Sequence, residues 1–406
     1  MLKQKFKIMK QYLKLSLFLF ALTFFAACNN KEVKTEKNEK TNTFTVSGEI
    51  KGLENNNLYY RFPGKDYEEL GYRIDSIIVT NNKFSFKDTI KGYHLVTFFT
   101  RIDGLQKTTS TGGYYPVKSA YLNLMIHPGA AINVTGKISD FMEAYPSGDA
   151  INDDFSKIHK EVFPVINESV NYLVRSTFEK DTILIKELRK KADSVGEIAG
   201  GIKKNFVENN PASVAALYYL SDMMMRSQIK DDEAIKTFNK VDKKLNKISF
   251  YKDIEKRIQG INATKIGQIV PEIKTTSTID NKEFDLTTYR GKYVMIDFWG
   301  TWCGPCVAEM PKVSEYAKKY KDKLEILGVN SGDSKKKMTD FLEKHNYKWQ
   351  QVLNVNGESN DNFVLKFNVT GFPTKFIIDP EGKIVKKYTG SGEEAFELLE
   401  ELLKSI

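Results

Sequence analysis

The spacing of hydrophobic and polar positions changes twice along this chain of 406 residues. Between residues 44 and 145, apolar positions alternate with polar ones or form short runs, and Asn82, Pro128 and Gly136 stand in the breaks between runs. A spacing of two is typical of strands with one buried face, so this segment predicts an antiparallel β-sandwich-like domain or an open barrel. Residues 146–265 instead show helical spacing, which predicts a central α-helical region.

Within the helical region, amphipathic helices are expected over residues 181–198, 214–225 and 230–246. Asn210 and Pro211 predict the start of the second helix, because Asn is a common N-cap and Pro suits the first helical turn. No internal repeat indicates a solenoid.

The third segment, residues 266–406, follows a stretch rich in Gly, Pro and Thr that marks a domain boundary. Its pattern alternates between strand and helix. Strands are predicted at 292–299, 324–330, 374–379 and 383–388, and helices at 303–320, 335–345 and 393–405. This alternation predicts an α/β layer with a mixed sheet.

The N-terminus has the pattern of an export signal. A lysine-rich head precedes the apolar run 15–27, whose 13 residues are too few to span a membrane. The stretch Phe25-Ala26-Ala27-Cys28 resembles the lipobox of bacterial lipoproteins, and this resemblance implies cleavage after residue 27 and a lipid anchor on Cys28. The alternative is a signal peptide without lipidation. Residues 28–43 are polar and predict a flexible tether, so we expect a lipid-anchored protein of the cell envelope, periplasmic or in the outer membrane.

The net charge of +9 does not indicate a nucleic-acid partner. Five of the positive charges lie in the leader, at Lys3, Lys5, Lys7, Lys10 and Lys14. The remaining chain mixes both signs, as a solvated surface does.

The chain has three cysteines, and two of them flank Gly304 and Pro305. If Cys28 carries lipid, Cys303 and Cys306 are the remaining thiols of an exported chain, which excludes a structural disulfide network. Only a thiolate attacks a disulfide, and the N–H groups and dipole at a helix start favour the anion. We therefore expect Cys303 to be the nucleophile and Cys306, one turn later, to resolve the mixed disulfide.

Two other interpretations of the cysteine pair are disfavoured. A zinc site needs four ligands, and the four histidines of the chain show no ligand spacing, so neither a metal nor another cofactor is expected. The second interpretation, an inert buried pair, does not explain why Gly304, Pro305 and the preceding Trp302 accompany the cysteines. Trp302 is expected to cover one side of the pair.

Two carboxylates are candidates for proton transfer. Asp297 interrupts an apolar strand, and burial there would raise its pKa and suit proton exchange with Cys306; the alternative is an aspartate turned to solvent. Glu309 lies three residues after Cys306 on the same helical face. Spacing alone leaves open whether Glu309 handles protons or is an exposed helix charge. Pro373 precedes a strand, and the local sequence favours an ordinary trans proline there.

Together these motifs resemble the thioredoxin superfamily, and within it the membrane-tethered TlpA/ResA-like thiol–disulfide oxidoreductases. The resemblance covers residues 266–406 and rests on Asp297 to Cys306, on Glu309 and Pro311, and on the segment 371–374. It implies a thioredoxin-like fold, a role for Glu309 in setting the cysteine pKa, and a cis bond before Pro373. It also implies a substrate-binding surface made by Trp302, Gly304, Pro305, Phe372 and Pro373. The front part resembles a β-rich domain without known activity that often precedes such modules in lipoproteins.

The expected activity is reduction of disulfides in exported proteins. Its partners would be protein disulfides or thiols and a membrane-side electron donor or acceptor. Thiol pairs of the Gly-Pro type have reduction potentials near about −270 mV, against about −120 mV for strong oxidants, which favours the reducing direction. Alternatives are a disulfide oxidase or isomerase, and a ligand- or partner-binding lipoprotein with a secondary redox module. A peroxidase is disfavoured because the stretch before Cys303 lacks the proline that peroxidatic motifs carry.

Overall fold

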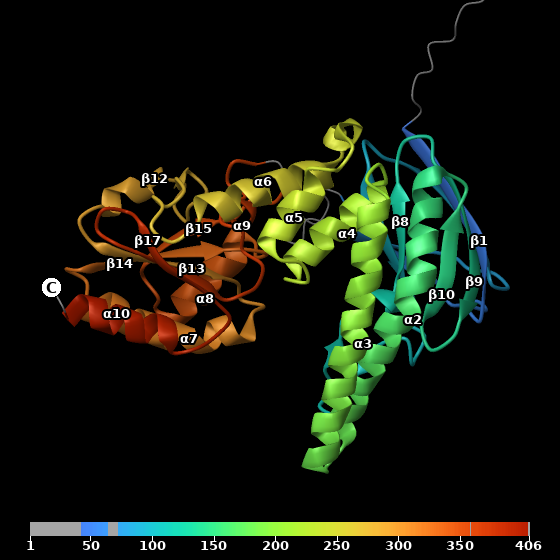
Figure 1. The fold of residues 1–406 in the computed structure, drawn as a ribbon, viewed down its shortest axis with the longest axis horizontal. Helices are drawn as coiled ribbons and strands as arrows, with labels where there is room; N and C mark the ends of the chain where they lie inside the picture. The colour runs from blue at the N-terminus through green and yellow to red at the C-terminus, as the bar shows by residue number, and fades with distance from the viewer. Residues whose placement is uncertain (1–41, 64–71, 358, 405–406) are drawn as a thin grey trace, which may run out of the picture. The chain divides into compact units, whose positions relative to one another are not determined.

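The computed structural model describes residues 42–63, 72–357 and 359–404 (Figure 1). The predicted signal peptide, Cys28 and nearly all of the predicted tether lie outside these residues. In the part of the chain that is described, every helix is too short or too polar to cross a membrane.

The first part of the described chain forms two four-stranded sheets. One has the strand order β10-β9-β1-β4 and the other β3-β2-β5-β8. The strands are β1 (Thr43–Lys51), β2 (Leu58–Pro63), β3 (Tyr72–Ile77), β4 (Lys83–Thr89), β5 (His94–Phe99), β8 (Leu122–Ile126), β9 (Ala131–Ile138) and β10 (Met142–Ser147). A small hairpin joins β6 (Lys107–Thr108) and β7 (Tyr114–Tyr115).

One hydrophobic core lies between these two sheets. Phe44 and Val134 come from the first sheet, and Phe98 and Leu124 from the second, and all four are fully or almost fully buried in one cluster. The sandwich-like prediction is therefore confirmed. Every pairing within the two sheets is antiparallel except that of β1 with β9, which is parallel.

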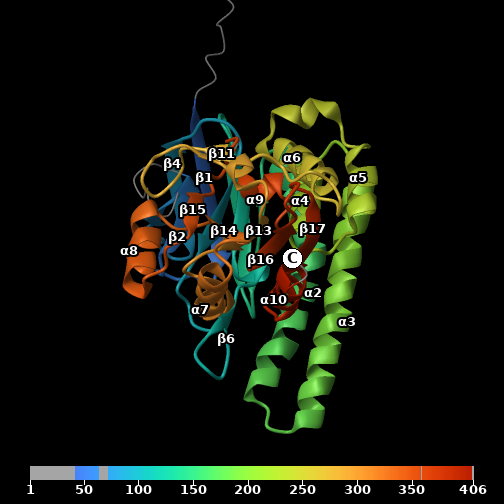
Figure 2. The ribbon, with the colours of Figure 1, turned by 90° about the vertical axis from the view of Figure 1, so that its left-hand side faces the viewer.

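The helical region begins with two long helices, α2 (Ala150–Phe178) and α3 (Thr182–Asn209), which lie side by side (Figure 2). The shorter α4 (Val214–Met225), α5 (Asp231–Phe238), the 3-10 helix η3 (Lys243–Lys247) and α6 (Ser249–Ala263) follow. Asn210 and Pro211 do not begin α4, contrary to the prediction. Ser213 is its N-cap, and the Ser213 side chain accepts a hydrogen bond from the backbone N–H of Ala216 at 3.3 Å.

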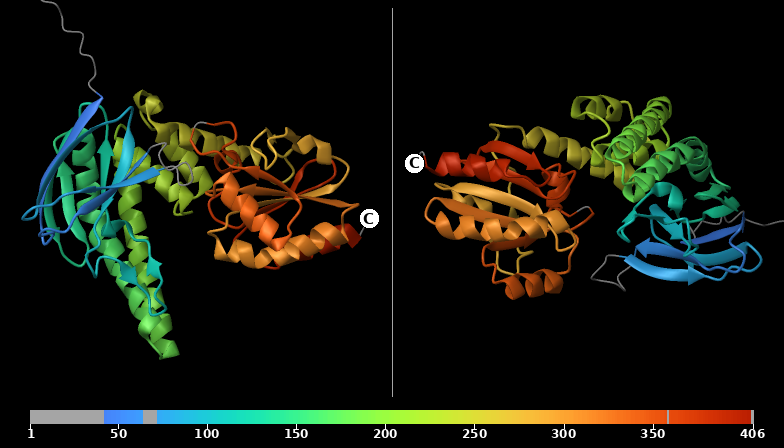
Figure 3. Two further views of the ribbon diagram at one scale, coloured as in Figure 1. Left: turned by 180° about the vertical axis from the view of Figure 1, so that it is seen from behind. Right: turned by 90° about the horizontal axis from the view of Figure 1, so that it is seen from below.

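The C-terminal part contains a five-stranded mixed sheet of order β15-β14-β13-β16-β17 (Figure 3). Its strands are β13 (Tyr293–Trp299), β14 (Leu324–Asn330), β15 (Gln350–Leu353), β16 (Thr374–Ile378) and β17 (Ile384–Thr389). Around them are α7 (Gly304–Lys319), α8 (Lys335–His345), α9 (Phe363–Lys366) and α10 (Glu394–Lys404). The pair β11 (Lys274–Thr275) and β12 (Phe284–Asp285) and the turn η4 (Leu286–Tyr289) precede the sheet.

Successive side chains of the central strand β13 point to opposite faces of the sheet, and each face packs in its own hydrophobic core. Ile296 and Phe298 pack with Phe367 of the segment after α9 on one face. Met295 packs with Val313 of α7 and Leu399 of α10 on the other. Since β13 is covered on both faces, its end is held rigidly, and this is where the first cysteine follows.

Candidate active site

The two cysteines lie at the start of α7, directly after the central strand. Cys303 is the N-cap of α7, Pro305 occupies its first turn, and both cysteines are buried. Their sulfur atoms are joined in a disulfide, with the Cα atoms 5.2 Å apart. The backbone N–H of Cys306 donates a hydrogen bond to Cys303 Sγ at 3.2 Å. This N–H contact and the helix dipole both act on the Cys303 sulfur, as the sequence predicts.

The turn between β13 and α7 is held by a residue that the sequence did not single out. Asp333 accepts hydrogen bonds from the Thr301 backbone N–H at 2.7 Å and from Thr301 Oγ1 at 2.6 Å. Burial opposes ionisation of Asp333, but hydrogen bonds from Lys337, Thr301 and Asn330 outweigh it and hold its pKa below the ordinary value. The Asp333 side chain is 0% exposed and forms an ion pair with Lys337 at 2.8 Å. Asp333 thus fixes the turn that presents the disulfide.

Two aromatic rings border the disulfide. Trp302 donates from Nε1 to the Ser331 carbonyl at 2.8 Å, and its ring forms a T-shaped contact with Phe372 at a centroid distance of 5.1 Å. Phe372 also packs in the cluster that contains Cys303 and Cys306. Trp302 is 53% exposed, so it offers a surface for a partner rather than a cover that seals the pair.

The bond between Phe372 and Pro373 is cis. The expectation from the family resemblance is confirmed, and the trans alternative favoured by local sequence is wrong. Of the residues predicted to bind substrate, Trp302 and Phe372 are in ring contact. Gly304 and Pro305 lie in the first turn of α7, beside the cysteines in sequence.

Asp297, Glu309 and Lys375 form one ionic group, which we call the carboxylate–lysine triad. Asp297 on β13 lies directly across from Lys375 on β16 in the strand register. Lys375 Nζ is 3.3 Å from Asp297 Oδ1 and 2.5 Å from Glu309 Oε2. Glu309 Oε1 also accepts a hydrogen bond from the Gly392 backbone N–H at 2.9 Å. Glu309 is therefore held by two partners, and since its side chain is 15% exposed, the alternative of an exposed helix charge is wrong.

Burial governs the charge state of the triad. Asp297 is 3% exposed, so the alternative of an aspartate turned to solvent is wrong. Burial raises the pKa of Asp297, although the Lys375 ammonium opposes the rise. Burial works against the Lys375 charge too, but Asp297 and Glu309 outweigh it and raise the pKa of that lysine. The triad thus pairs one cation with two carboxylates, one of which holds a proton more readily than usual.

Lys375 was missed although the sequence carried a signal for it. It interrupts the apolar strand β16 in the way that Asp297 interrupts β13, and its side chain is almost completely buried. A buried lysine needs a carboxylate partner, so the two interruptions predict one another.

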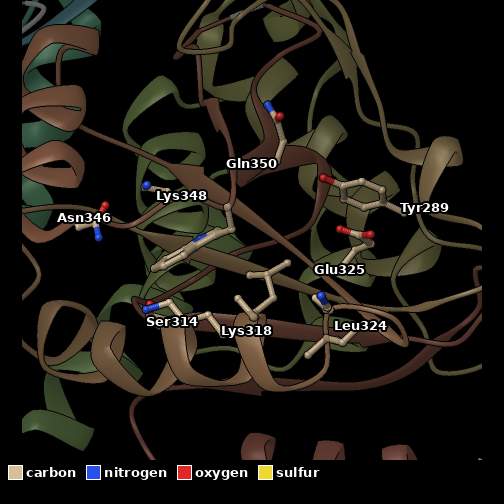
Figure 4. A pocket seen from close by; sticks show the side chains of 12 residues that line it. Tyr289, Ser314, Lys318, Leu324, Glu325, Asn346, Lys348 and Gln350 are labelled. Atoms are coloured by element: carbon tan, nitrogen blue, oxygen red, sulfur yellow. The ribbon is translucent and has the colours of Figure 1, made fainter.

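A hollow of about 600 Å³ opens beside the second half of α7 (Figure 4). Ser314 and Lys318 of α7 line it, together with Glu325 of β14 and Gln350 of β15. It shares no lining residue with the predicted site. Within the described residues, no group of His, Cys, Asp and Glu side chains is arranged to hold a metal ion.

Two family models match the chain. The AhpC/TSA family matches residues 266–387, and the domain of unknown function DUF4369 matches residues 44–155. Among curated relatives, the thiol-disulfide oxidoreductase ResA of Bacillus thuringiensis subsp. konkukian is 34% identical over 143 residues, which cover 35% of this chain and 79% of that protein. ResA of Geobacillus thermodenitrificans is 37% identical over 130 residues, which cover 32% of this chain and 72% of that protein.

Solved structures align with about a third of the chain. The thioredoxin domain of a thiol-disulfide oxidoreductase from Bacteroides vulgatus is 27% identical, with a TM-score of 0.31, over 34% of this chain and 98% of that domain. An exposed lipoprotein thioredoxin from Streptococcus pneumoniae is also 27% identical, with a TM-score of 0.29, over 34% of this chain and all of that chain.

Proposed function

The chain belongs, through its C-terminal domain, to the ResA family of thiol–disulfide oxidoreductases, and on this premise we propose that it reduces disulfides of exported proteins through Cys303 and Cys306. The observation that carries the proposal is the disulfide at the start of α7, with Cys303 as the N-cap and a backbone N–H directed at its sulfur. The ResA relatives carry the name thiol-disulfide oxidoreductase, which supports thiols and disulfides of proteins as the substrates that we propose.

The exchange proceeds in two steps. The Cys303 thiolate attacks one sulfur of the substrate disulfide, and the other substrate sulfur leaves as a thiolate. The Cys306 thiolate then attacks Cys303 Sγ, breaks the mixed disulfide and releases the second substrate sulfur. The substrate gains two electrons, and the enzyme ends as the Cys303–Cys306 disulfide seen here. A dithiol donor on the membrane side must reduce that disulfide before the next turnover.

Cys306 must lose its proton before the second step. The triad supports Asp297 as the acceptor, because its buried carboxylate has a raised pKa. The Lys375 ammonium lowers the pKa of Asp297 and the Glu309 carboxylate raises it, so both act on proton transfer through Asp297 as positioning residues. The exposed Trp302 and the neighbouring Phe372 are proposed to receive the polypeptide around the substrate disulfide.

We further propose that a lipid on Cys28 anchors the protein in the cell envelope. The lipobox-like sequence before Cys28 and the polar stretch after it support this proposal. Metabolic labelling with a radioactive fatty acid tests it: the full-length chain should incorporate label and the Cys28→Ser variant should not. Labelling of both proteins, or of neither, contradicts the anchor.

A trapping experiment tests the exchange. In Cys306→Ser the second step is blocked, so mixed disulfides with substrate proteins should accumulate on Cys303. The matched variant Cys303→Ser lacks the attacking sulfur and should trap far fewer partners. Adducts are separated by non-reducing electrophoresis, and their release by dithiothreitol is checked. Equal adduct levels in the two variants, or none in either, would refute the proposal.

The direction of exchange has its own measurement. Equilibration of the Cys303–Cys306 pair against glutathione buffers gives its reduction potential. A value near that of thioredoxin, about −270 mV, supports a reductase. A value above that of disulfide isomerases, about −180 mV, supports the oxidase or isomerase alternative instead.

A further inference from the structure

A group of four charged side chains, three of them largely buried, lies in the region before the thioredoxin-like domain. It consists of Lys118, Lys203, Asp222 and Arg226, and we call it the cationic cluster. Lys118 Nζ on the 3-10 helix η2 (Lys118–Ala120) is 2.8 Å from Asp222 Oδ1. Lys203 Nζ on α3 is 3.4 Å from Asp222 Oδ2, and Arg226 Nε is 2.9 Å from Asp222 Oδ1. The cluster therefore joins η2, α3 and the end of α4.

The cluster holds three cations against one carboxylate. Among the residues that the structure describes, Asp222 is the one acid within ion-pair distance of these three side chains. The other polar partners are neutral: Lys203 donates to Gln228 Oε1 at 3.0 Å, and Lys118 donates to the Tyr218 hydroxyl at 2.6 Å. An excess of positive charge thus remains after all of these contacts are counted.

Water can compensate little of the charge on the two lysines, whereas Arg226 is half exposed. The side chain of Lys203 is 4% exposed and that of Asp222 is 9% exposed. Burial lowers the pKa of Lys118 and of Lys203 to about 8 in spite of the attraction to Asp222. A buried charge without a counter-ion is costly, so the cluster would be stabilised by one more negative charge.

Space for that charge adjoins the cluster. A cavity of about 170 Å³ is lined by Lys118, Lys203, Arg226 and Gln228. The rest of its described lining is Pro116, Val117, Ile166, Ser169, Val170, Gly196 and Ala199, which includes no carboxylate. By volume the cavity holds about five water molecules, which suits a small ion.

We propose that this cavity binds a small oxyanion, a carboxylate or inorganic phosphate, through the ammonium groups of Lys118 and Lys203 and the guanidinium of Arg226. The apolar wall formed by Val117, Ile166 and Val170 leaves room for a short apolar substituent on a carboxylate. The site does not depend on the thiol chemistry, because none of its residues belongs to the segment 266–387 that matches the redox family. It gives residues 44–265 a binding role in addition to any structural one.

A purely structural cluster makes a different prediction. If Asp222 only joins η2 to α3 and α4, replacing it should lower stability, and added anions should not matter. If the cavity binds an oxyanion, Asp222 competes with that ligand for the same cations. Asp222→Asn should then bind the oxyanion more tightly than the unmodified chain does, and the oxyanion should restore part of its lost thermal stability.

Binding is measured by titration calorimetry on the whole chain without its leader, at constant ionic strength set with sodium chloride. Phosphate and acetate are the two probes. Saturable binding of phosphate alone assigns a phosphate site, binding of acetate alone assigns a carboxylate site, and binding of both assigns an oxyanion site without discrimination. Absence of saturable binding for both probes overturns the proposal.

Variants locate the site. Lys203→Met should weaken binding roughly tenfold or more, because it removes a charge-assisted hydrogen bond. Lys190→Met changes the same charge on the exposed surface of the same helix, α3, and should leave affinity unchanged. Should Lys203→Met fail to fold, as judged by its circular dichroism, Arg226→Gln serves instead, because Arg226 is half exposed. If all folded variants bind the oxyanion probe with the same affinity, the ion does not bind in this cavity and the proposed site is refuted.

Discussion

At the scale of single residues, the active site depends on one lysine between two carboxylates. Lys375 contacts both Asp297 and Glu309, and each of the three side chains comes from a different element. Burial raises the pKa of Asp297, and the Lys375 charge limits that rise. The proton affinity of Asp297 is therefore set by a residue outside the Cys-Gly-Pro-Cys motif.

Replacing Lys375 by Met should move the pH profile of exchange toward higher pH. Asp297 must be ionised to accept the Cys306 proton, so the rate of the second exchange step should rise with pH through the Asp297 pKa. Without the Lys375 charge that pKa rises further. Once the pKa lies above neutral pH, each further increase of one in its value lowers the rate at neutral pH roughly tenfold. Stopped-flow release of a small aromatic thiol from the mixed disulfide, followed across pH, measures the change.

The matched control is Lys386→Met on the neighbouring strand β17. Lys386 is exposed and lies across from Ile377 in the register, so it carries the same charge without touching the triad. Its pH profile should equal that of the unmodified chain. If Lys375→Met shows the same profile as this control, the triad does not govern proton transfer.

Sequence reasoning reached part of this site and missed the rest for a physical reason. Asp297 stood out because burial of one carboxylate in an apolar strand is costly. Glu309 could not be decided, because its partners Lys375 and Gly392 are distant in sequence. Spacing within a helix reports neighbours within that helix alone. The family resemblance, not the spacing, correctly predicted the cis bond before Pro373.

At the scale of elements, the start of α7 is positioned by the loop after β14. Asp333 in that loop accepts hydrogen bonds from Thr301 and from Asn330 Nδ2. The loop and the turn before α7 follow neighbouring parallel strands, since β13 pairs with β14 in parallel. This arrangement brings the two segments to the same end of the sheet.

Asp333→Ala should destabilise the chain by about 2–4 kcal/mol, because it leaves several buried donors without an acceptor. The pKa of Asp333 is lower in the folded chain than its ordinary value of 3.8, so its stabilising effect is present above pH 3.8. The effect is lost as pH falls through the lower, folded pKa. Urea unfolding measures the free energy of unfolding of the variant and of the unmodified chain. The difference between the two should be largest at neutral pH and should shrink as the pH is lowered into the acidic range.

Asp340→Ala on α8 is the control for this prediction. Asp340 is largely exposed and pairs with Lys336 four residues earlier. An exposed ion pair of this kind contributes at most about 1 kcal/mol. If both variants lose the same stability, Asp333 is no more than a surface charge.

Elements were predicted best where their contacts are local. The strands and helices that were predicted within residues 266–406 lie close to the observed ones, because each buried face repeats with its own period. The edge strand β15 and the short helix α9 were not predicted. The parallel pairing of β1 with β9 was not predicted, because seven other strands lie between these two in the sequence. The range 214–225 predicted for α4 is confirmed, but its cap was assigned wrongly: Asn210 and Ser213 are both acceptable N-cap residues, and Ser213 caps the helix in the structure.

At the scale of the whole molecule, the helical region contacts the thioredoxin-like domain through α6. The buried Arg257 donates from Nη1 to Asn368 Oδ1 at 3.0 Å and to the Val369 carbonyl at 3.2 Å. Val369 lies four residues before Pro373, so this contact reaches the segment that enters the active site. One helix thus links the part with the proposed oxyanion cavity to the part with the cysteines.

Close packing of α6 depends on Gly260. A Cβ atom at this position would lie 2.6 Å from the Leu365 carbonyl oxygen and 2.7 Å from the Lys366 carbonyl oxygen. Both neighbours are backbone atoms of α9, which cannot yield as a flexible side chain does. Gly260→Leu should therefore separate α6 from α9 at a cost of roughly 1–3 kcal/mol, and expose the connection between α6 and β11.

Limited proteolysis measures this separation. Cleavage between residues 264 and 273 should be faster in Gly260→Leu than in the unmodified chain, while reduction of a small soluble disulfide by Cys303 should be retained. Gly201→Leu is the control, because a Cβ at Gly201 on α3 meets no atom within 4 Å. Equal cleavage in both variants would mean that α6 does not hold the two parts together. Loss of disulfide reduction in Gly260→Leu alone would mean that the contact through Arg257 also shapes the loop before Pro373.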